Sequence, residues 1–183
     1  ILSKQALLKT EDMEVTLLDT PGHVDFSAEM ERTLQVLDYA ILVINGMDGV
    51  QSHTMTLWRL LERYHIPTFL FVNKMDQQGT DHDALIMDLK QHLHENCVDF
   101  GRTERDQESA DSSLTSEQME NIAVCDEQLL EKYLETGEVS VQETTGLIAE
   151  RKVFPCYFGS ALKMEGVKDF LKGIETYTTE PKR

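Results

Sequence analysis

The chain of 183 residues has a formal net charge of −16, with 40% hydrophobic and 27% charged residues. This size and composition are typical of a globular protein with one sizeable core, or of one domain that carries an insertion. The acidic balance argues against a protein that binds nucleic acid, such as DNA, across its whole surface. The longest apolar runs, residues 39–44 and 68–72, are far too short to span a membrane, so we expect a cytoplasmic protein without membrane contact.

The negative charge is concentrated in one segment. Residues 102–138 hold eleven acidic and three basic side chains, which accounts for half of the net charge. A solvated acidic surface is the default interpretation of such a segment. The rest of the chain is only mildly acidic, so a local contact with a ribonucleoprotein is compatible with its charge.

The cysteines and histidines do not have the spacing of a metal site. Cys97, Cys125 and Cys156 are scattered and lack a CxxC pattern, which indicates buried thiols in a reducing compartment and not a structural zinc site. His92 and His94 lie two positions apart on a predicted helix and would point to different faces. A metal-dependent hydrolase of another class therefore fits this sequence poorly.

Strands and helices alternate along most of the chain. Residues 1–10 and 14–19 predict an antiparallel pair of strands, and an amphipathic helix is expected over residues 23–37. Buried strands are then expected at residues 39–44, 68–72 and 153–158, and further helices at residues 51–64, 81–94 and 166–177. The pattern is typical of an α/β fold, here one domain with a mostly parallel sheet flanked by helices.

The alternation stops between residues 98 and 152, where the sequence predicts a helical insertion. Thr115 with Gln118, and Ser140 with Glu143, have the spacing of capping boxes that open helices. Residues 126–134 predict another amphipathic helix between them.

A short apolar run leads into the sequence Asp19-Thr20-Pro21-Gly22-His23. A carboxylate at a strand end suits Mg²⁺, usually through water because this ion dehydrates reluctantly. Gly22 has no side chain, so a terminal phosphate can approach its N–H, and loss of that phosphate would release the turn. His23 is placed to orient a water molecule for attack on the phosphate. The ordinary alternative is a strand-to-helix turn in which Asp19 is a cap and His23 a polar residue.

A second motif, Asn73-Lys74-Met75-Asp76, follows a predicted buried strand. An ionised Asp76 accepts two hydrogen bonds, which guanine offers from its ring N–H and exocyclic amine and adenine does not; such buried polar pairing discriminates steeply. The stem of Lys74 can lie along the purine face, and Asn73 can tie this loop to the base or to a neighbouring phosphate loop. A polar turn after a strand is the alternative, since this pattern also occurs by chance.

The third motif, Gly159-Ser160-Ala161, follows the last predicted strand. Small residues at this position let the backbone N–H groups of Ser160 and Ala161 approach a purine oxygen. All three motifs end predicted strands, and in open α/β sheets ligands bind beyond the carboxyl ends of the strands. Together the motifs predict most of a guanine-nucleotide site.

These motifs, with Val24-Asp25-Phe26, Glu31-Arg32 and Leu37-Asp38, resemble the GTP-binding domain of translational GTPases. The resemblance implies a P-loop-NTPase-like G domain that binds GTP or GDP with Mg²⁺ and contacts the ribosome, both rRNA and ribosomal proteins, through a larger parent. By resemblance, Asp19 is linked to magnesium, Gly22 senses the γ-phosphate and His23 is catalytic because it positions the attacking water. Asn73, Lys74 and Asp76 would bind guanine, with Ser160 and Ala161 in support.

Two relatives within this family share these features: elongation factor G and the tetracycline-resistance ribosomal protection proteins. The interval between residues 77 and 158 is shorter than the insertion usual in elongation factor G. The sequences Asp76-Gln77-Gln78-Gly79 and Leu129-Leu130-Glu131-Lys132-Tyr133 also look more like the protection proteins. The resemblance therefore favours a protection protein, with elongation factor G, the translocase, as the alternative.

One part of the family's site has no counterpart in these residues. The sequence contains no GxxxxGK[ST] phosphate loop, which would supply the phosphate cradle and a hydroxyl ligand for magnesium. The family's switch threonine would fall just before Ile1. We therefore expect a fragment of a longer protein that, by itself, binds GTP poorly and does not hydrolyse it.

The strand that precedes such a phosphate loop would lie between the strands ending at Asp19 and Ile44. We expect either a gap in the sheet at that place or another element that fills it. A non-hydrolysing interaction module, which binds a partner through the acidic insertion, is the competing hypothesis for the chain.

Overall fold

The computed structural model describes residues 5–10, 13–19, 32, 34–35, 37–101 and 114–178. The helix predicted over residues 23–37 falls mostly outside this part; Arg32, Leu34 and Gln35 are helical, and the Leu34 side chain is fully buried. Among the described residues, no helix has both the length and the apolar character needed to cross a membrane.

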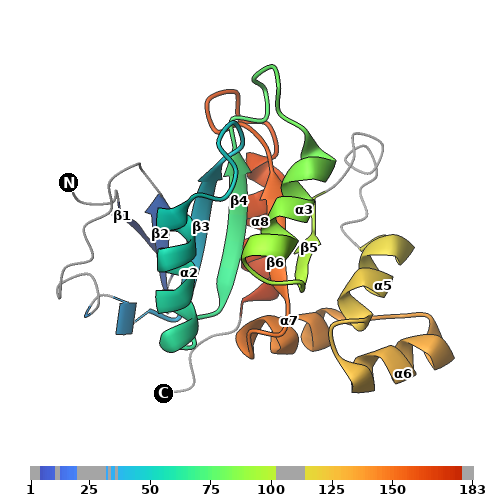
Figure 1. The fold of residues 1–183 in the computed structure, drawn as a ribbon. Coiled ribbons are helices and arrows are strands. Elements are labelled where there is room, and N and C mark those ends of the chain that lie inside the picture. Colours follow the sequence, from blue (N-terminus) through green and yellow to red (C-terminus); the bar gives the residue numbers. More distant parts are fainter. Residues whose placement is uncertain are drawn as a thin grey trace.

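In the described part of the chain, six strands form one mostly parallel sheet (Figure 1), in the order β1-β2-β3-β4-β6-β5. They are β1 (Gln5–Thr10), β2 (Met13–Asp19), β3 (Tyr39–Asn45), β4 (Thr68–Asn73), β5 (Cys97–Asp99) and β6 (Phe154–Phe158). Only the β1–β2 pair is antiparallel, and the four other pairs are parallel. The predicted fold class and the predicted N-terminal antiparallel pair are both confirmed.

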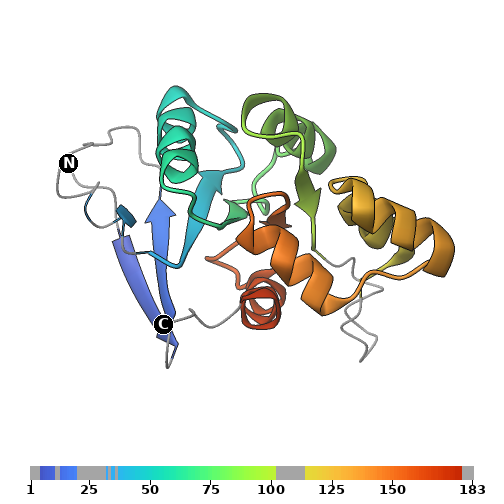
Figure 2. The same cartoon turned by 90° about the horizontal axis from the view of Figure 1, so that it is seen from below.

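Helices cover both faces of the sheet. Figure 2 shows α2 (Ser52–Arg63) and α3 (His82–His92) on one face and α8 (Val167–Tyr177) on the other. Three further helices follow β5: α5 (Ser116–Ala123), α6 (Glu127–Thr136) and α7 (Val141–Ala149). In both views α5 and α6 lie beyond the β5 edge, and α7 packs against α8.

Alternation along the central strands divides the core into two layers. In β3, the side chains of Ala40, Leu42 and Ile44 join the cluster that α2 and α3 cover. Tyr39 and Ile41 point the other way, into the cluster that α8 covers. Successive residues of a strand face opposite sides, so a strand buried on both faces needs a continuous apolar run. This is why residues 39–44 and 68–72 stand out in the sequence.

The expectation of a gap, or of a filling element, between the strands ending at Asp19 and Ile44 is wrong. Strand β2 pairs directly with β3 in parallel, from Val15 opposite Tyr39 to Asp19 opposite Val43. Unpaired backbone N–H and C=O groups in the middle of a sheet are costly, and direct pairing satisfies them. The pairing also brings the end of β2 to the same edge of the sheet as the ends of β3 and β4.

The predicted start of the helical insertion, at residue 98, needs correction as well. Residues Cys97–Asp99 form the short edge strand β5, parallel to β6, and Phe100 N extends the pairing by donating to Cys156 O at 2.9 Å. A strand of three residues is too short to show periodicity in the sequence. The two predicted capping boxes are confirmed, at Thr115 for α5 and at Ser140 for α7.

Candidate guanine-nucleotide site

The ends of β3, β4 and β6 are joined by backbone hydrogen bonds beyond the regular sheet. Gly46 N donates to Asn73 O at 2.8 Å, and Met75 N donates to Gly159 O at 3.0 Å. Gly159 N in turn donates to Val72 O at 3.0 Å. The second and third predicted motifs are therefore brought together at one edge, as their positions at strand ends predict.

The side chain of Asn73 completes the connection between the two loops. Its Oδ1 accepts a hydrogen bond from Ala161 N at 2.9 Å, across 88 positions of sequence. Ser160 N donates to Glu165 O at 2.9 Å, and Glu165 N donates back to Ser160 O at 3.0 Å. Residues 73–76 and 159–165 thus form one unit, called the joined loops below.

These bonds also bear on the role predicted for Ser160 and Ala161. Both backbone N–H groups donate within the protein, to Glu165 O and to Asn73 Oδ1. In this conformation they fix the loops to each other. A contact from Ala161 N to a purine oxygen would require that N–H to leave or share its bond with Asn73.

Lys74 adopts an unusual backbone conformation inside the motif. Its φ is 64°, in the left-handed region that residues other than glycine, asparagine and aspartate seldom adopt. Two bonds hold the turn: Gln77 N donates to Lys74 O at 3.2 Å, and Thr80 Oγ1 donates to Met75 O at 3.1 Å. Such conformations persist where the surroundings over-determine them, and they cluster at binding sites.

The Asp76 side chain is mostly buried, with 14% of its surface exposed. Its Oδ2 lies 3.9 Å from the Nζ atom of Lys163, whose side chain is 57% exposed and comes from the other joined loop. A carboxylate in this position can accept two parallel hydrogen bonds from a flat donor pair. This is the chemistry predicted for recognition of guanine.

Gly159 is required by the close approach of two backbone segments. A Cβ atom at this position would collide with Glu165 O and lie 3.1 Å from the Glu165 carbonyl carbon. Gly166 has a φ of 73°, and a Cβ there would lie 2.6 Å from Phe158 O. The glycine of the third motif therefore serves packing within the joined loops.

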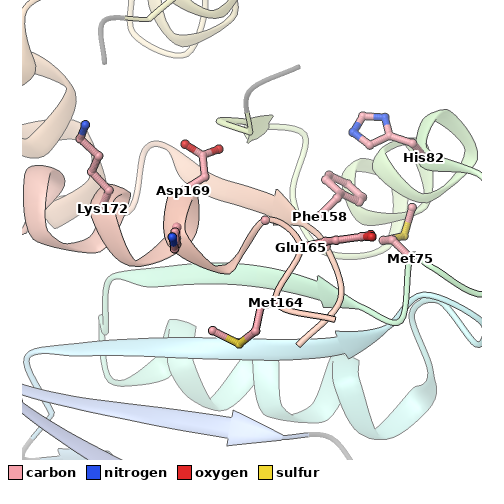
Figure 3. A pocket seen from close by; sticks show the side chains of 10 residues that line it. Met75, His82, Phe158, Met164, Glu165, Asp169 and Lys172 are labelled. Atoms are coloured by element: carbon pink, nitrogen blue, oxygen red, sulfur yellow. The ribbon is translucent and has the colours of Figure 1, made fainter. Parts of the chain in front are cut away.

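A cavity of about 690 Å³ lies beside the joined loops (Figure 3). Residues of α8 form one wall, with Asp169 and Lys172 labelled, and Phe158 and His82 lie at its other end. His82 Nε2 is 2.8 Å from Asp99 Oδ2, and the centroid of its ring lies 4.1 Å from that of Phe158, with the two rings tilted by 50°. The hydrogen bond to Asp99, with Coulombic attraction, raises the pKa of His82 although partial burial opposes the shift.

The first motif is described only in part. Asp19 ends β2 at the same edge as Asn73, but its side chain lies outside the described portion of the chain, and so do Gly22 and His23. Their predicted roles in magnesium binding, phosphate sensing and catalysis therefore stay predictions. Among the side chains that are described, no group of three or more His, Cys, Asp or Glu residues could hold a metal ion.

Comparison with known proteins identifies the family. Residues 1–180 match the family model of the elongation factor Tu GTP binding domain. The chain belongs to this family. A crystal structure of the protein ttk003000868 from Thermus thermophilus is also similar, with 26% sequence identity and a TM-score of 0.73. The match covers 98% of this chain and 32% of that one, so this elongation factor Tu-type domain spans about a third of its solved relative.

Family membership places the joined loops in a domain with a known fold. The family is one of GTPases, so this elongation factor Tu-type domain has the fold of a GTP-binding domain. Sequence reasoning missed two features of the site: the approach of Lys163 to Asp76 and the contact of His82 with Asp99. Each joins residues far apart in sequence, and no local pattern marked either of them.

Proposed function

We propose that this domain binds guanine nucleotide at the joined loops, as part of a ribosome-associated translational GTPase that hydrolyses GTP. The arrangement of Asp76 carries the proposal. Its carboxylate is mostly buried, and hydrogen bonds between Asn73 and Ala161 and between Met75 and Gly159 hold the loops that surround it. Asp76 accepts the ring N–H and the amine of guanine, while the stem of Lys74 lies along the base.

The phosphate end of the nucleotide is assigned to the first motif. The position of Asp19 at the end of β2, on the edge shared with β3 and β4, supports this assignment. In this proposal, Asp19 would hold Mg²⁺, Gly22 would contact the γ-phosphate and His23 would orient the attacking water, as the sequence predicts. Mg²⁺ offsets charge on the phosphates when bound.

Exchange of Asp76 for asparagine tests the base-recognition step. In the full-length protein, Asp76→Asn should weaken GTP binding by about 100-fold and favour xanthosine nucleotides, because an amide presents a donor where guanine also presents one. The measurement is competition of GTP and XTP for the protein in the presence of magnesium. An unchanged preference for guanine would contradict the proposal.

The 183-residue chain by itself should hydrolyse no measurable GTP, since its sequence has no GxxxxGK[ST] loop to cradle the phosphates. Release of inorganic phosphate by this chain, purified and free of other GTPases, would refute that expectation. The same sequence feature supports a second candidate, an interaction module that does not hydrolyse nucleotide. Failure of the full-length protein to bind any guanine nucleotide would favour this second candidate.

Within the family, we propose the ribosomal protection type, which confers tetracycline resistance. The short interval between the second and third motifs and the sequence Asp76-Gln77-Gln78-Gly79 support this choice. The full-length protein with GTP should then release labelled tetracycline from ribosomes, and His23→Ala should abolish repeated rounds of release. Movement of tRNA and messenger without tetracycline release would indicate elongation factor G instead.

A further inference from the structure

Lys163 lies beside the carboxylate of Asp76, the residue proposed to recognise guanine, although Lys163 belongs to none of the predicted motifs. Its Nζ is 3.9 Å from Asp76 Oδ2. The Asp76 side chain is 14% exposed, while Lys163 keeps 57% of its side-chain surface in solvent. The positive charge therefore sits at the rim of a nearly buried negative charge.

The backbone at Lys163 is held in place by the loop that carries it. Lys163 N donates to Ser160 Oγ at 3.3 Å, and Ser160 is itself 1% exposed. The paired backbone of Ser160 and Glu165 closes the turn on both sides of Lys163. The lysine stem therefore starts from a fixed point, and its ammonium group reaches across to the other joined loop.

A base that covers Asp76 removes water from an ionised carboxylate. A buried anion is costly unless it is paired, and guanine offers only neutral donors. A carboxylate has about four lone-pair positions, of which guanine needs two. A cation on the flank of Oδ2 can therefore remain while the base binds, and its attraction strengthens as water leaves.

We propose that Lys163 is a positioning residue for guanine recognition. Its positive charge balances the negative charge of Asp76 while the base is bound to that carboxylate. The inference rests on the proposed function, because it takes Asp76 as the residue that reads the base. It predicts that Lys163 contributes to guanine affinity only when residue 76 is ionised. A lysine that acted through general surface charge would contribute equally with Asp76 or with asparagine at that position.

A double-mutant cycle on the full-length protein tests this, with the nucleosides guanosine and xanthosine as probes so that no phosphate is involved. Affinities would be measured by saturation-transfer NMR. Lys163→Met should weaken guanosine binding about fivefold, as expected for a partly exposed ion pair worth up to about 1 kcal/mol. Lys163→Arg should retain affinity to within about twofold, since it keeps the charge.

Two further variants complete the design. In an Asp76→Asn background, Lys163→Met should change xanthosine affinity by less than about twofold, because the negative charge at residue 76 is gone. Lys90→Met is the control for loss of one positive charge, since Lys90 is exposed on α3 and lines neither the joined loops nor the cavity beside them. It should leave guanosine affinity unchanged.

Each result bears on a distinct claim. A fivefold loss that persists with Asn at position 76, or that Lys90→Met reproduces, would overturn the role of Lys163. Tighter guanosine binding by Lys163→Met would also overturn it, because Lys163 would then compete with the base. Absence of guanosine binding, or equal binding of adenosine, by the full-length protein without substitutions would instead overturn the proposed function.

Discussion

The joined loops and the helices α5 to α7 are stabilised in opposite ways. The loops have their shape because residues from distant parts of the chain bond to each other, as Asn73 does to Ala161 and Met75 to Gly159. The helices are built from bonds between near neighbours, such as the capping boxes at Thr115 and Ser140. Ion pairs at the surface, including Lys132 with Glu143, add to the helical segment.

This difference indicates in which region the chain tolerates substitutions that remove a hydrogen bond. A local bond can be lost from a helix end with little effect on the rest of the helix. A bond between the joined loops fixes two segments at once, so its loss disturbs every residue that depends on their spacing. The variants below separate the two cases by the size of their effect on the free energy of unfolding.

Gly159→Ala should have the largest effect. The new methyl group would collide with Glu165 O, and backbone atoms cannot move aside as the end of a flexible side chain can. We expect a loss of about 3 kcal/mol in the free energy of unfolding, as for overpacking in a rigid site. Urea denaturation followed by circular dichroism measures it.

Gly146→Ala is the matched control in the helical segment. Gly146 lies within α7, and its Cβ would point into open space, with no described atom within 4 Å apart from its chain neighbours and the backbone of its own helix. Alanine favours a helix over glycine by about 0.5–1 kcal/mol, so this variant should be more stable than the unaltered chain. Equal losses from the two substitutions would refute the distinction between the regions.

Arg151→Met should have the next largest effect, because Arg151 fixes the end of the helical segment to the sheet. Its guanidinium carbon lies 5.1 Å from the centroid of the Trp58 ring and 4.9 Å from the centroid of the Phe154 ring. It also donates to Ile66 O and to Thr68 Oγ1. Burial lowers the pKa of this guanidinium to about 10, so it stays charged at neutral pH.

The loss of these contacts should reduce the free energy of unfolding by about 2 kcal/mol. Thermal unfolding at pH 7 measures the change. Arg151→Lys keeps the charge but not the planar group, and should recover less than half of the loss. Full recovery by lysine would show that charge alone accounts for the effect.

Ser140→Ala should cost less, because the hydroxyl bond that it removes is local. Ser140 Oγ accepts from Glu143 N at 3.1 Å, and Glu143 Oε1 accepts from Ser140 N at 3.0 Å. Loss of an N-cap hydroxyl costs about 1 kcal/mol. Amide hydrogen exchange should show the change in α7 and not in the joined loops. Faster exchange at Ala161 would contradict the local account.

His82→Gln should have the smallest effect, and one that depends on pH. The hydrogen bond to Asp99 raises the pKa of His82 in the folded chain, so protonated His82 stabilises the fold. This stabilisation is complete below the ordinary histidine value of about 6.5 and is lost as pH rises through the raised folded value. The difference between the unaltered chain and the variant should therefore be larger at pH 5.5 than at pH 8.5.

Because both partners are about one-third or more exposed, solvent screening limits the difference to a few tenths of a kcal/mol. Unfolding by urea at the two pH values measures it. A difference that grew toward pH 8.5 would refute the assignment of this contact.

Much of the fold could be predicted from the sequence because its signals are local. Continuous apolar runs marked β3 and β4, and capping boxes, whose two residues lie three positions apart, marked the starts of α5 and α7. The strand β5 was missed because three residues carry no periodicity. The direct pairing of β2 with β3 was missed because the sequence does not state which strands are neighbours.

The sequence by itself determined the family and the residues expected to read guanine, since these depend on short motifs in a fixed order. Only the tertiary structure decided how the motifs are joined. Asn73 bonds to Ala161, and Lys163 approaches Asp76, across 88 and 87 positions of sequence. Such contacts arise because neighbouring parallel strands end at the same edge of the sheet, which brings together residues that no local pattern connects.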